Sequence, residues 1–156
     1  MSQDFFDLRP SSALVWPVPL ASLRRVGQSV LSDRDGKGRP HYGLDLFAPA
    51  ETPILSAGDG RIVRVVDGRK SPDLARVRAG LWVDVAGQDW LFRYLHMGSV
   101  VVSAESKIKR GALIGFLADN RNGEPHLHFE IRRTDAVNGR YGDAIDPLRL
   151  LPTRSS

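Results

Sequence analysis

The feature that most constrains the fold is a regular series of short apolar segments separated by turn residues. The segments are rich in Val, Ile and aromatic residues and are bounded by Gly, Asp or Asn, as β-strands are. Their even spacing, with turn signals between them, is typical of an all-β sandwich or barrel. The expected strands cover residues 61–68, 81–87, 89–97, 99–105, 112–119 and 126–133.

The connections between these segments are short. The stretch VAGQDW at 85–90 separates two strand-like runs by a few turn residues and predicts a hairpin. Two short helices are also expected. One follows Ser71 as a cap with Pro72 in its first turn and ends at Gly80, and the other begins at Asp146 and Pro147 and stops before Pro152.

Composition narrows the class of protein. The 156 residues suit one domain with a substantial core, and the chain contains no cysteine, which excludes disulfides, cysteine–zinc sites and a cysteine nucleophile. The net charge of +4 favours contact with polyanions such as nucleic acid, membrane surfaces or anionic cell-wall polymers. The basic residues are spread thinly and lack interleaved aromatic residues, so we do not expect a dedicated nucleic-acid site.

The segment HLHFE at 126–130 holds two of the four histidines of the chain. On a strand, residues two apart point to the same face about 6.6–6.8 Å apart, so His126 and His128 share a face while Leu127 and Phe129 point into the core. Glu130 falls on the histidine face, where it either supports a histidine or, as we expect, faces a groove or solvent. Taken alone, the pair could be surface histidines or part of a metal site.

The segment HYGLD at 41–45 offers a second pair of polar groups. If the segment is extended, His41, Gly43 and Asp45 also share one face, and Gly43 leaves room for a metal ion to approach. Leu44 and Phe47 would turn elsewhere, Leu44 into the core. Imidazole nitrogen and carboxylate oxygen are both zinc ligands, and a catalytic zinc keeps three protein ligands and one position for water. His41, Asp45 and one histidine of the H-x-H pair would complete such a set.

His96 is the remaining histidine, at the end of the apolar run FRYLH. A lone histidine in this position is commonly a packing or capping residue. A hydrolytic zinc site, however, needs groups that orient water, move its proton and stabilise the developing oxyanion, and imidazole can do each of these near neutral pH. The chain lacks the G-x-S-x-G motif of serine hydrolases, a phosphate-binding loop and the helical H-E-x-x-H zinc motif.

Together these motifs resemble the LytM/lysostaphin-type zinc metallopeptidases of the M23 family. The resemblance lies in HYGLDLFAPAETPILSAGDGRIVRVV, YLHMGSV, IKRGALIGFLAD, EPHLHFEIR and IDP, which occur in the expected order from about Trp16 to Pro147. It implies an antiparallel, two-sheet, β-sandwich-like fold. We therefore expect an N-terminal extension at 1–15, a single peptidase domain at 16–152 and a C-terminal tail at 153–156.

The resemblance also implies a role for each site residue. The zinc ligands would be His41, Asp45 and His128, and His96 and His126 would act on the water and on the tetrahedral intermediate. The expected function is zinc-dependent endopeptidase cleavage of peptidoglycan stem peptides or crossbridges, with one Zn²⁺ per chain. The alternative is a non-catalytic regulator on the same fold that activates another cell-wall hydrolase.

Some residues depart from the family pattern. Glu51 stands where glycine is usual, Glu124 lies in a segment that is usually rich in Gly, Thr or Ser, and the insert at 67–80 is unusual. We expect these changes to affect the groove walls and substrate choice. The N-terminus shows no basic segment followed by an apolar one, so no secretory signal is predicted, and no apolar run is long enough to span a membrane. We expect a monomer that acts at the cell wall, in the periplasm or outside the cell.

Overall fold

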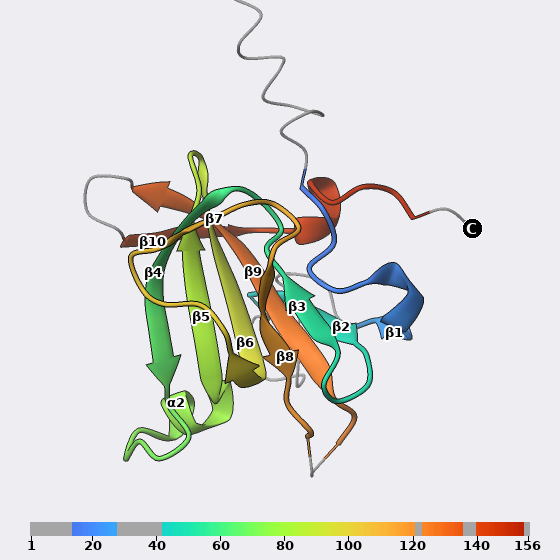
Figure 1. The fold of residues 1–156 in the computed structure, drawn as a ribbon, viewed down its shortest axis with the longest axis vertical. Coiled ribbons are helices and arrows are strands. Elements are labelled where there is room, and N and C mark those ends of the chain that lie inside the picture. The colour runs from blue at the N-terminus through green and yellow to red at the C-terminus, as the bar shows by residue number, and fades with distance from the viewer. Residues whose placement is uncertain (1–13, 28–41, 121–122, 136–139, 155–156) are drawn as a thin grey trace, which may run out of the picture.

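The computed structural model describes residues 14–27, 42–120, 123–135 and 140–154. Within these ranges β-strands dominate and the helices are short (Figure 1). The strands are β1 (Arg25–Val26), β2 (Leu44–Phe47), β3 (Pro53–Leu55), β4 (Gly60–Asp67), β5 (Leu81–Ala86), β6 (Trp90–Val100), β7 (Lys107–Ile108), β8 (Leu113–Leu117), β9 (His126–Asp135) and β10 (Arg140–Ile145). The helices are α2 (Leu74–Ala79) and the 3₁₀ turns η1 (Leu20–Ser22) and η2 (Pro147–Arg149).

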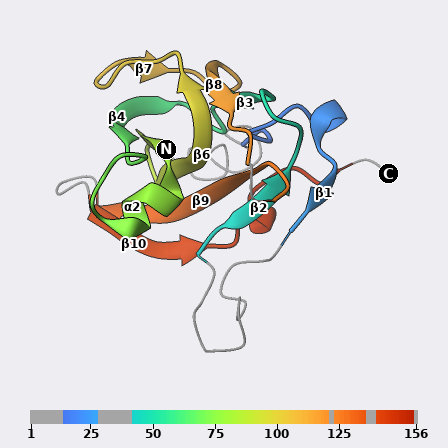
Figure 2. The same cartoon turned by 90° about the horizontal axis from the view of Figure 1, so that it is seen from below.

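The strands form one hydrogen-bonded network in which each described pair is antiparallel. Its main path runs β1-β2-β9-β6-β5-β4-β7, while β10 pairs with β9 and β8 pairs with both β3 and β6. Figure 2 shows β3 and β8 above β9 and β2, with β10 below them. The predicted antiparallel, sandwich-like β-fold is therefore confirmed.

Strand β6 belongs to both halves of this arrangement. Residues from Trp90 to Leu95 pair with β9, whereas Met97 to Val100 pair with β8. The register of β6 against β5 shifts in the same place, and the residue at the switch, His96, has a φ of 71°. A β-bulge of this kind bends a strand and redirects a side chain. His96 thus lies at the point where β6 stops pairing with β9 and begins to pair with β8.

The core is built by the two-residue alternation of the strands. Leu127 and Phe129 on β9, Leu44 and Leu46 on β2, and Tyr94 on β6 are fully buried. Leu44 lies directly opposite Phe129, and Leu46 opposite Leu127, so one face of the β2–β9 ladder is apolar throughout. The predicted inward orientation of Leu44, Leu127 and Phe129 is confirmed, and the opposite face is left for polar side chains.

Several local predictions need correction. The first helix begins later than expected because Asp73, not Ser71, caps it by accepting a hydrogen bond from the Ala75 N–H, although Gly80 ends it as predicted. The expected strand at 99–105 stops at Val100, where β6 ends. The rest of the segment is a loop in which Glu105 adopts a left-handed φ of 73°. In the second helix Asp146 caps Pro147–Arg149 as predicted.

The described helices are all short. Within the described ranges, no helix has the length and hydropathy needed to cross a membrane.

Candidate active site

The centre of the site is a carboxylate and an imidazole on neighbouring strands. The register of β2 against β9 places Asp45 directly opposite His128, on the polar face of the ladder. His128 Nδ1 lies 3.2 Å from Asp45 Oδ1, and both residues are buried. Residues 83 apart in the chain are thus brought into contact by strand pairing.

Both ring nitrogens of His128 face carboxylates. Nδ1 contacts Asp45, and Nε2 lies 2.8 Å from Glu130 Oε2. Burial lowers the pKa of His128, but the hydrogen bonds to Asp45 and Glu130 outweigh it, so the net shift is upward. Both nitrogens can donate at once only in the imidazolium form, and a metal ion that binds Nδ1 has to replace the proton there.

His126 lies on the same face of β9 as predicted, and its environment fixes its tautomer. Nδ1 lies 3.1 Å from the carbonyl oxygen of Glu124. Because a carbonyl can only accept, Nδ1 carries the proton and Nε2 is left as the acceptor. The ring of Phe47 packs against His126 with 5.0 Å between centroids, which corrects the expectation that Phe47 turns elsewhere.

His96 completes the group of histidines. Its ring centroid is 4.9 Å from that of His126 and 6.1 Å from that of His128, with edge-on geometry in both cases. A ring N–H donates to the carbonyl of Ala79, the last residue of α2. Burial, together with the nearby His126 and His128, lowers the pKa of His96 to about 4, so the ring is neutral at physiological pH.

Glu130 does not face solvent or a groove, as the sequence led us to expect. It is 5% exposed, and its two oxygens bind His128 Nε2 and Arg132 Nε. Burial raises the pKa of Glu130, but the hydrogen bond to His128 and the charges of His128 and Arg132 lower it overall, so it is ionised. The signal for this role was its position two residues after His128, on the same face.

Gly43 precedes β2 at the edge of the site. A Cβ at this position would lie 2.5 Å from His128 Nε2 and 2.8 Å from the carbonyl oxygen of Phe129. Both distances are shorter than real Cβ contacts allow. The absence of a side chain at Gly43 therefore allows the His128 ring and the β9 backbone to approach closely.

The donor set fits two of the three predicted zinc ligands. Asp45 supplies a carboxylate oxygen and His128 a ring nitrogen, both are ligand types that Zn²⁺ prefers, and the two atoms converge. His41, the third predicted ligand, lies outside the described residues. Inside those residues no group of three or more His, Cys, Asp or Glu side chains is arranged to hold a metal ion.

The three departures from the family pattern have structural correlates. Glu51 has a φ of 67°, a left-handed conformation that glycine adopts more easily. Glu124 binds Arg25 at 2.7 Å, and the Arg25 guanidinium lies 3.7 Å from the centroid of the Phe47 ring. The insert forms the exposed helix α2, whose end contacts His96.

Sequence comparison assigns this arrangement to a family. The model of peptidase family M23 matches residues 39–147, which include the H-x-x-x-D and H-x-H motifs. The chain belongs to peptidase family M23. The resemblance inferred from the motifs is thereby confirmed. Of the predicted site residues that the structure describes, Asp45 lies on β2, His96 on β6, and His126 and His128 on β9.

The relatives of this M23 chain include a named endopeptidase and a named hydrolase activator. Peptidoglycan DD-endopeptidase ShyA of Vibrio cholerae is 35% identical over 108 residues, covering 68% of this chain and 22% of ShyA. Murein hydrolase activator NlpD of Salmonella typhimurium is 26% identical over 145 residues, covering 93% of this chain and 33% of NlpD.

A solved structure agrees with the fold. A zinc containing peptidase from Vibrio cholerae matches with a TM-score of 0.69 and 28% identity, over 90% of this chain and 41% of that chain. The chain thus spans from 22% to 41% of the length of these three proteins.

Proposed function

We propose that this chain is a zinc-dependent endopeptidase that hydrolyses peptide bonds in peptidoglycan stem peptides or crossbridges. The observation that carries the proposal is the convergence of Asp45 and His128 with His96 and His126 on one face of the sheet. Membership of peptidase family M23 and the likeness to ShyA support the same function.

Asp45, His128 and His41 would hold the metal ion. Bound Zn²⁺ supplies Lewis-acid polarisation of a carbonyl and lowers the pKa of water. The remaining work falls to the two other histidines. Because Nδ1 of His126 donates to the Glu124 carbonyl, Nε2 faces away from that contact and can accept a hydrogen bond from the attacking water.

His126 then moves the proton, and His96 positions the water. Burial lowers the pKa of His96 to about 4, which disfavours protonation of its ring. His126, whose Nε2 is the accepting nitrogen, takes the proton as water attacks the peptide carbonyl. The resulting imidazolium can donate to the developing oxyanion and later to the leaving amine. His96, tied to Ala79 through one ring nitrogen, holds the water with the other.

The test is cleavage of muropeptides of defined crosslink type, read by mass spectrometry of the fragments. Cleavage should stop after chelation and return with Zn²⁺. His126→Ala should still bind zinc but lose at least about a hundredfold in rate, since general acid–base catalysis contributes roughly 10²–10⁴-fold. Glu105→Gln, an exposed carboxylate that binds Arg61, is the matched control. Undiminished cutting by the chelated protein or by His126→Ala would contradict the proposal.

The second candidate function is activation of a partner cell-wall hydrolase. It is favoured by the likeness to NlpD, which is named a murein hydrolase activator and covers 93% of this chain. The ligand-type residues Asp45 and His128 are retained here, which favours the enzyme. Stimulation of a purified hydrolase by a His41→Ala/His128→Ala double variant would favour the activator.

We also propose that the chain acts as a monomeric domain, with limits near residues 16–152, at the cell wall in the periplasm or outside the cell. Its net charge of +4 would then attract anionic wall polymers. Binding to isolated walls should weaken as salt rises, because exposed charges are screened beyond about 10 Å at 0.1 M salt. Binding that is independent of salt would contradict this electrostatic contribution.

A further inference from the structure

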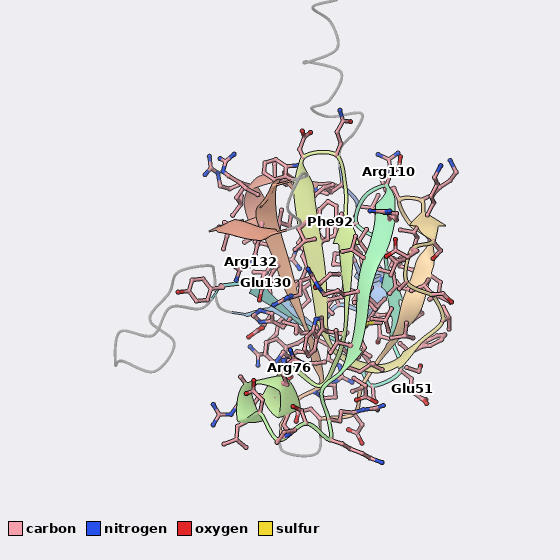
Figure 3. The ribbon with its side chains drawn as sticks, turned by 90° about the vertical axis from the view of Figure 1, so that its left-hand side faces the viewer. Glu51, Arg76, Phe92, Arg110, Glu130 and Arg132 are labelled. Atoms are coloured by element: carbon pink, nitrogen blue, oxygen red, sulfur yellow. The ribbon has the colours of Figure 1, made fainter. Side chains whose placement is uncertain are left out.

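The predicted zinc ligand His128 contacts a buried ion pair formed by Glu130 and Arg132. Glu130 uses one oxygen for each neighbour, with Oε2 at 2.8 Å from His128 Nε2 and Oε1 at 2.6 Å from Arg132 Nε. Figure 3 shows Glu130 and Arg132 close together on β9. Glu130 takes no part in the proton transfers above, and burying its carboxylate is costly unless the charge is paired.

The geometry bears on which nitrogen of His128 can bind a metal ion. A neutral imidazole carries one proton, and only the other nitrogen has a lone pair for a ligand bond. An ionised carboxylate can only accept, so Glu130 favours the proton on Nε2. Asp45 competes for a proton on Nδ1, but its contact of 3.2 Å is longer than the 2.8 Å contact of Glu130.

We propose that Glu130, held by Arg132, is a positioning residue that keeps the His128 proton on Nε2 and so presents Nδ1 to the metal ion beside Asp45. The inference rests on the proposed function only in taking Asp45 and His128 as zinc ligands. Histidine ligands commonly donate their second N–H to a carboxylate, and loss of that partner typically weakens metal affinity about 10–100-fold.

Arg132 orients the Glu130 carboxylate toward His128. Its guanidinium occupies Oε1 of Glu130, which leaves Oε2 for His128. The same guanidinium lies 5.3 Å from the centroid of the Tyr42 ring. Tyr42 directly precedes Gly43 at the start of β2, so Arg132 also links β9 to the segment that carries Asp45.

The experiment uses an isosteric change. In Glu130→Gln the amide oxygen is expected to accept from Arg132, and the amide NH₂ then donates to His128 Nε2. This arrangement forces the His128 proton onto Nδ1, where it opposes metal binding. The affinity of the metal-free chain for Zn²⁺ is measured by competition with a chromophoric chelator. We expect Glu130→Gln to bind Zn²⁺ about 10–100-fold more weakly, and Glu105→Gln to bind as the parent does.

A second variant tests the tautomer itself. In Glu130→Gln/Arg132→Met the amide oxygen is free to face His128, so part of the lost affinity should return. Long-range ¹H–¹⁵N spectra of the metal-free chain with neutral His128 should place the proton on Nε2 in the parent and on Nδ1 in Glu130→Gln. A merely structural role for Glu130 would not move that proton.

Three results would overturn the inference: parent-like zinc affinity in Glu130→Gln, an unchanged tautomer, or no recovery in the double variant. Zinc affinity is measured without any peptide. A parent chain that binds zinc with this dependence on Glu130 but cuts no peptidoglycan would therefore contradict the proposed function and support the inference. A parent chain that binds no zinc would overturn both.

Discussion

The rings of His96 and His126 meet edge-on with 4.9 Å between their centroids, although the residues come from different strands. His96 reaches this position because β6 has a bulge where it passes from β9 to β8. Left-handed φ in a residue other than glycine costs about 1–3 kcal/mol and persists only where the surroundings enforce it. Here the neighbouring strand pairs and the contact with Ala79 supply that enforcement.

Acid should destabilise the fold through His96. Its folded-state pKa of about 4 lies below the reference value of 6.5, so between these pH values the unfolded chain binds the proton and the folded chain does not. The contribution of His96 to stability should therefore rise as pH increases from 4 to 6.5, by at most about 3 kcal/mol, and stay constant above.

The measurement is the free energy of unfolding of metal-free parent and His96→Gln across this range. Comparing the two variants cancels most of the opposite effect of His128, whose pKa is raised. A difference between them that does not change from pH 4 to pH 6.5 would contradict the assigned burial of His96.

Gly43→Ala should disrupt the site more than the fold. The new Cβ would meet the His128 ring and the Phe129 carbonyl, so β2 or the ring must move. We expect zinc affinity to fall at least tenfold, while unfolding by urea remains cooperative. Gly111→Ala is a useful contrast, because its φ of 84° is also unfavourable for alanine but nothing lies within 4 Å of the added Cβ. Equal zinc affinities in the two variants would count against this account of Gly43.

Tyr94→Phe should weaken the core. The Ala57 N–H donates to Tyr94 Oη at 2.9 Å, and both residues are fully buried. Removing the hydroxyl leaves a buried N–H without its partner, which costs about 1–3 kcal/mol. Denaturant unfolding of the metal-free chain measures the loss. Tyr42→Phe, at an exposed position, should change stability by less than about 0.5 kcal/mol. If Tyr94→Phe lost no more stability than Tyr42→Phe, the hydrogen bond between Ala57 and Tyr94 would not contribute to stability.

Zinc should stabilise the folded chain through the predicted ligands. A ligand that binds only the folded state adds about 2.7 kcal/mol at a hundredfold excess over its dissociation constant. We therefore expect the melting temperature to rise with added Zn²⁺ and to fall again with a chelator. The rise should be lost in Asp45→Ala and kept in His126→Ala, and the reverse pattern would exchange the roles assigned to these residues.

Local sequence determined those parts of the protein that depend on near neighbours. The two-residue period of a strand is enough to place His126 and His128 on one face and Leu127 and Phe129 in the core. Residue type determined the caps at Asp146 and Gly80 as well. The same reasoning failed at residues 101–105. The Val101 N–H still donates to Ile114 on β8 and the Glu105 N–H to Ile62 on β4, but between these contacts the chain leaves β8, and Glu105 has a left-handed φ of 73°.

Tertiary structure decided what depends on distant parts of the chain. The register between β2 and β9 brings Asp45 to His128, and the bulge in β6 turns His96 toward both histidines of β9. The sequence could suggest that Glu130 shares a face with His128, but not that this face is covered there. Burial depends on what packs above a strand, and only the folded chain makes the Glu130 carboxylate a partner of His128 instead of a group in water.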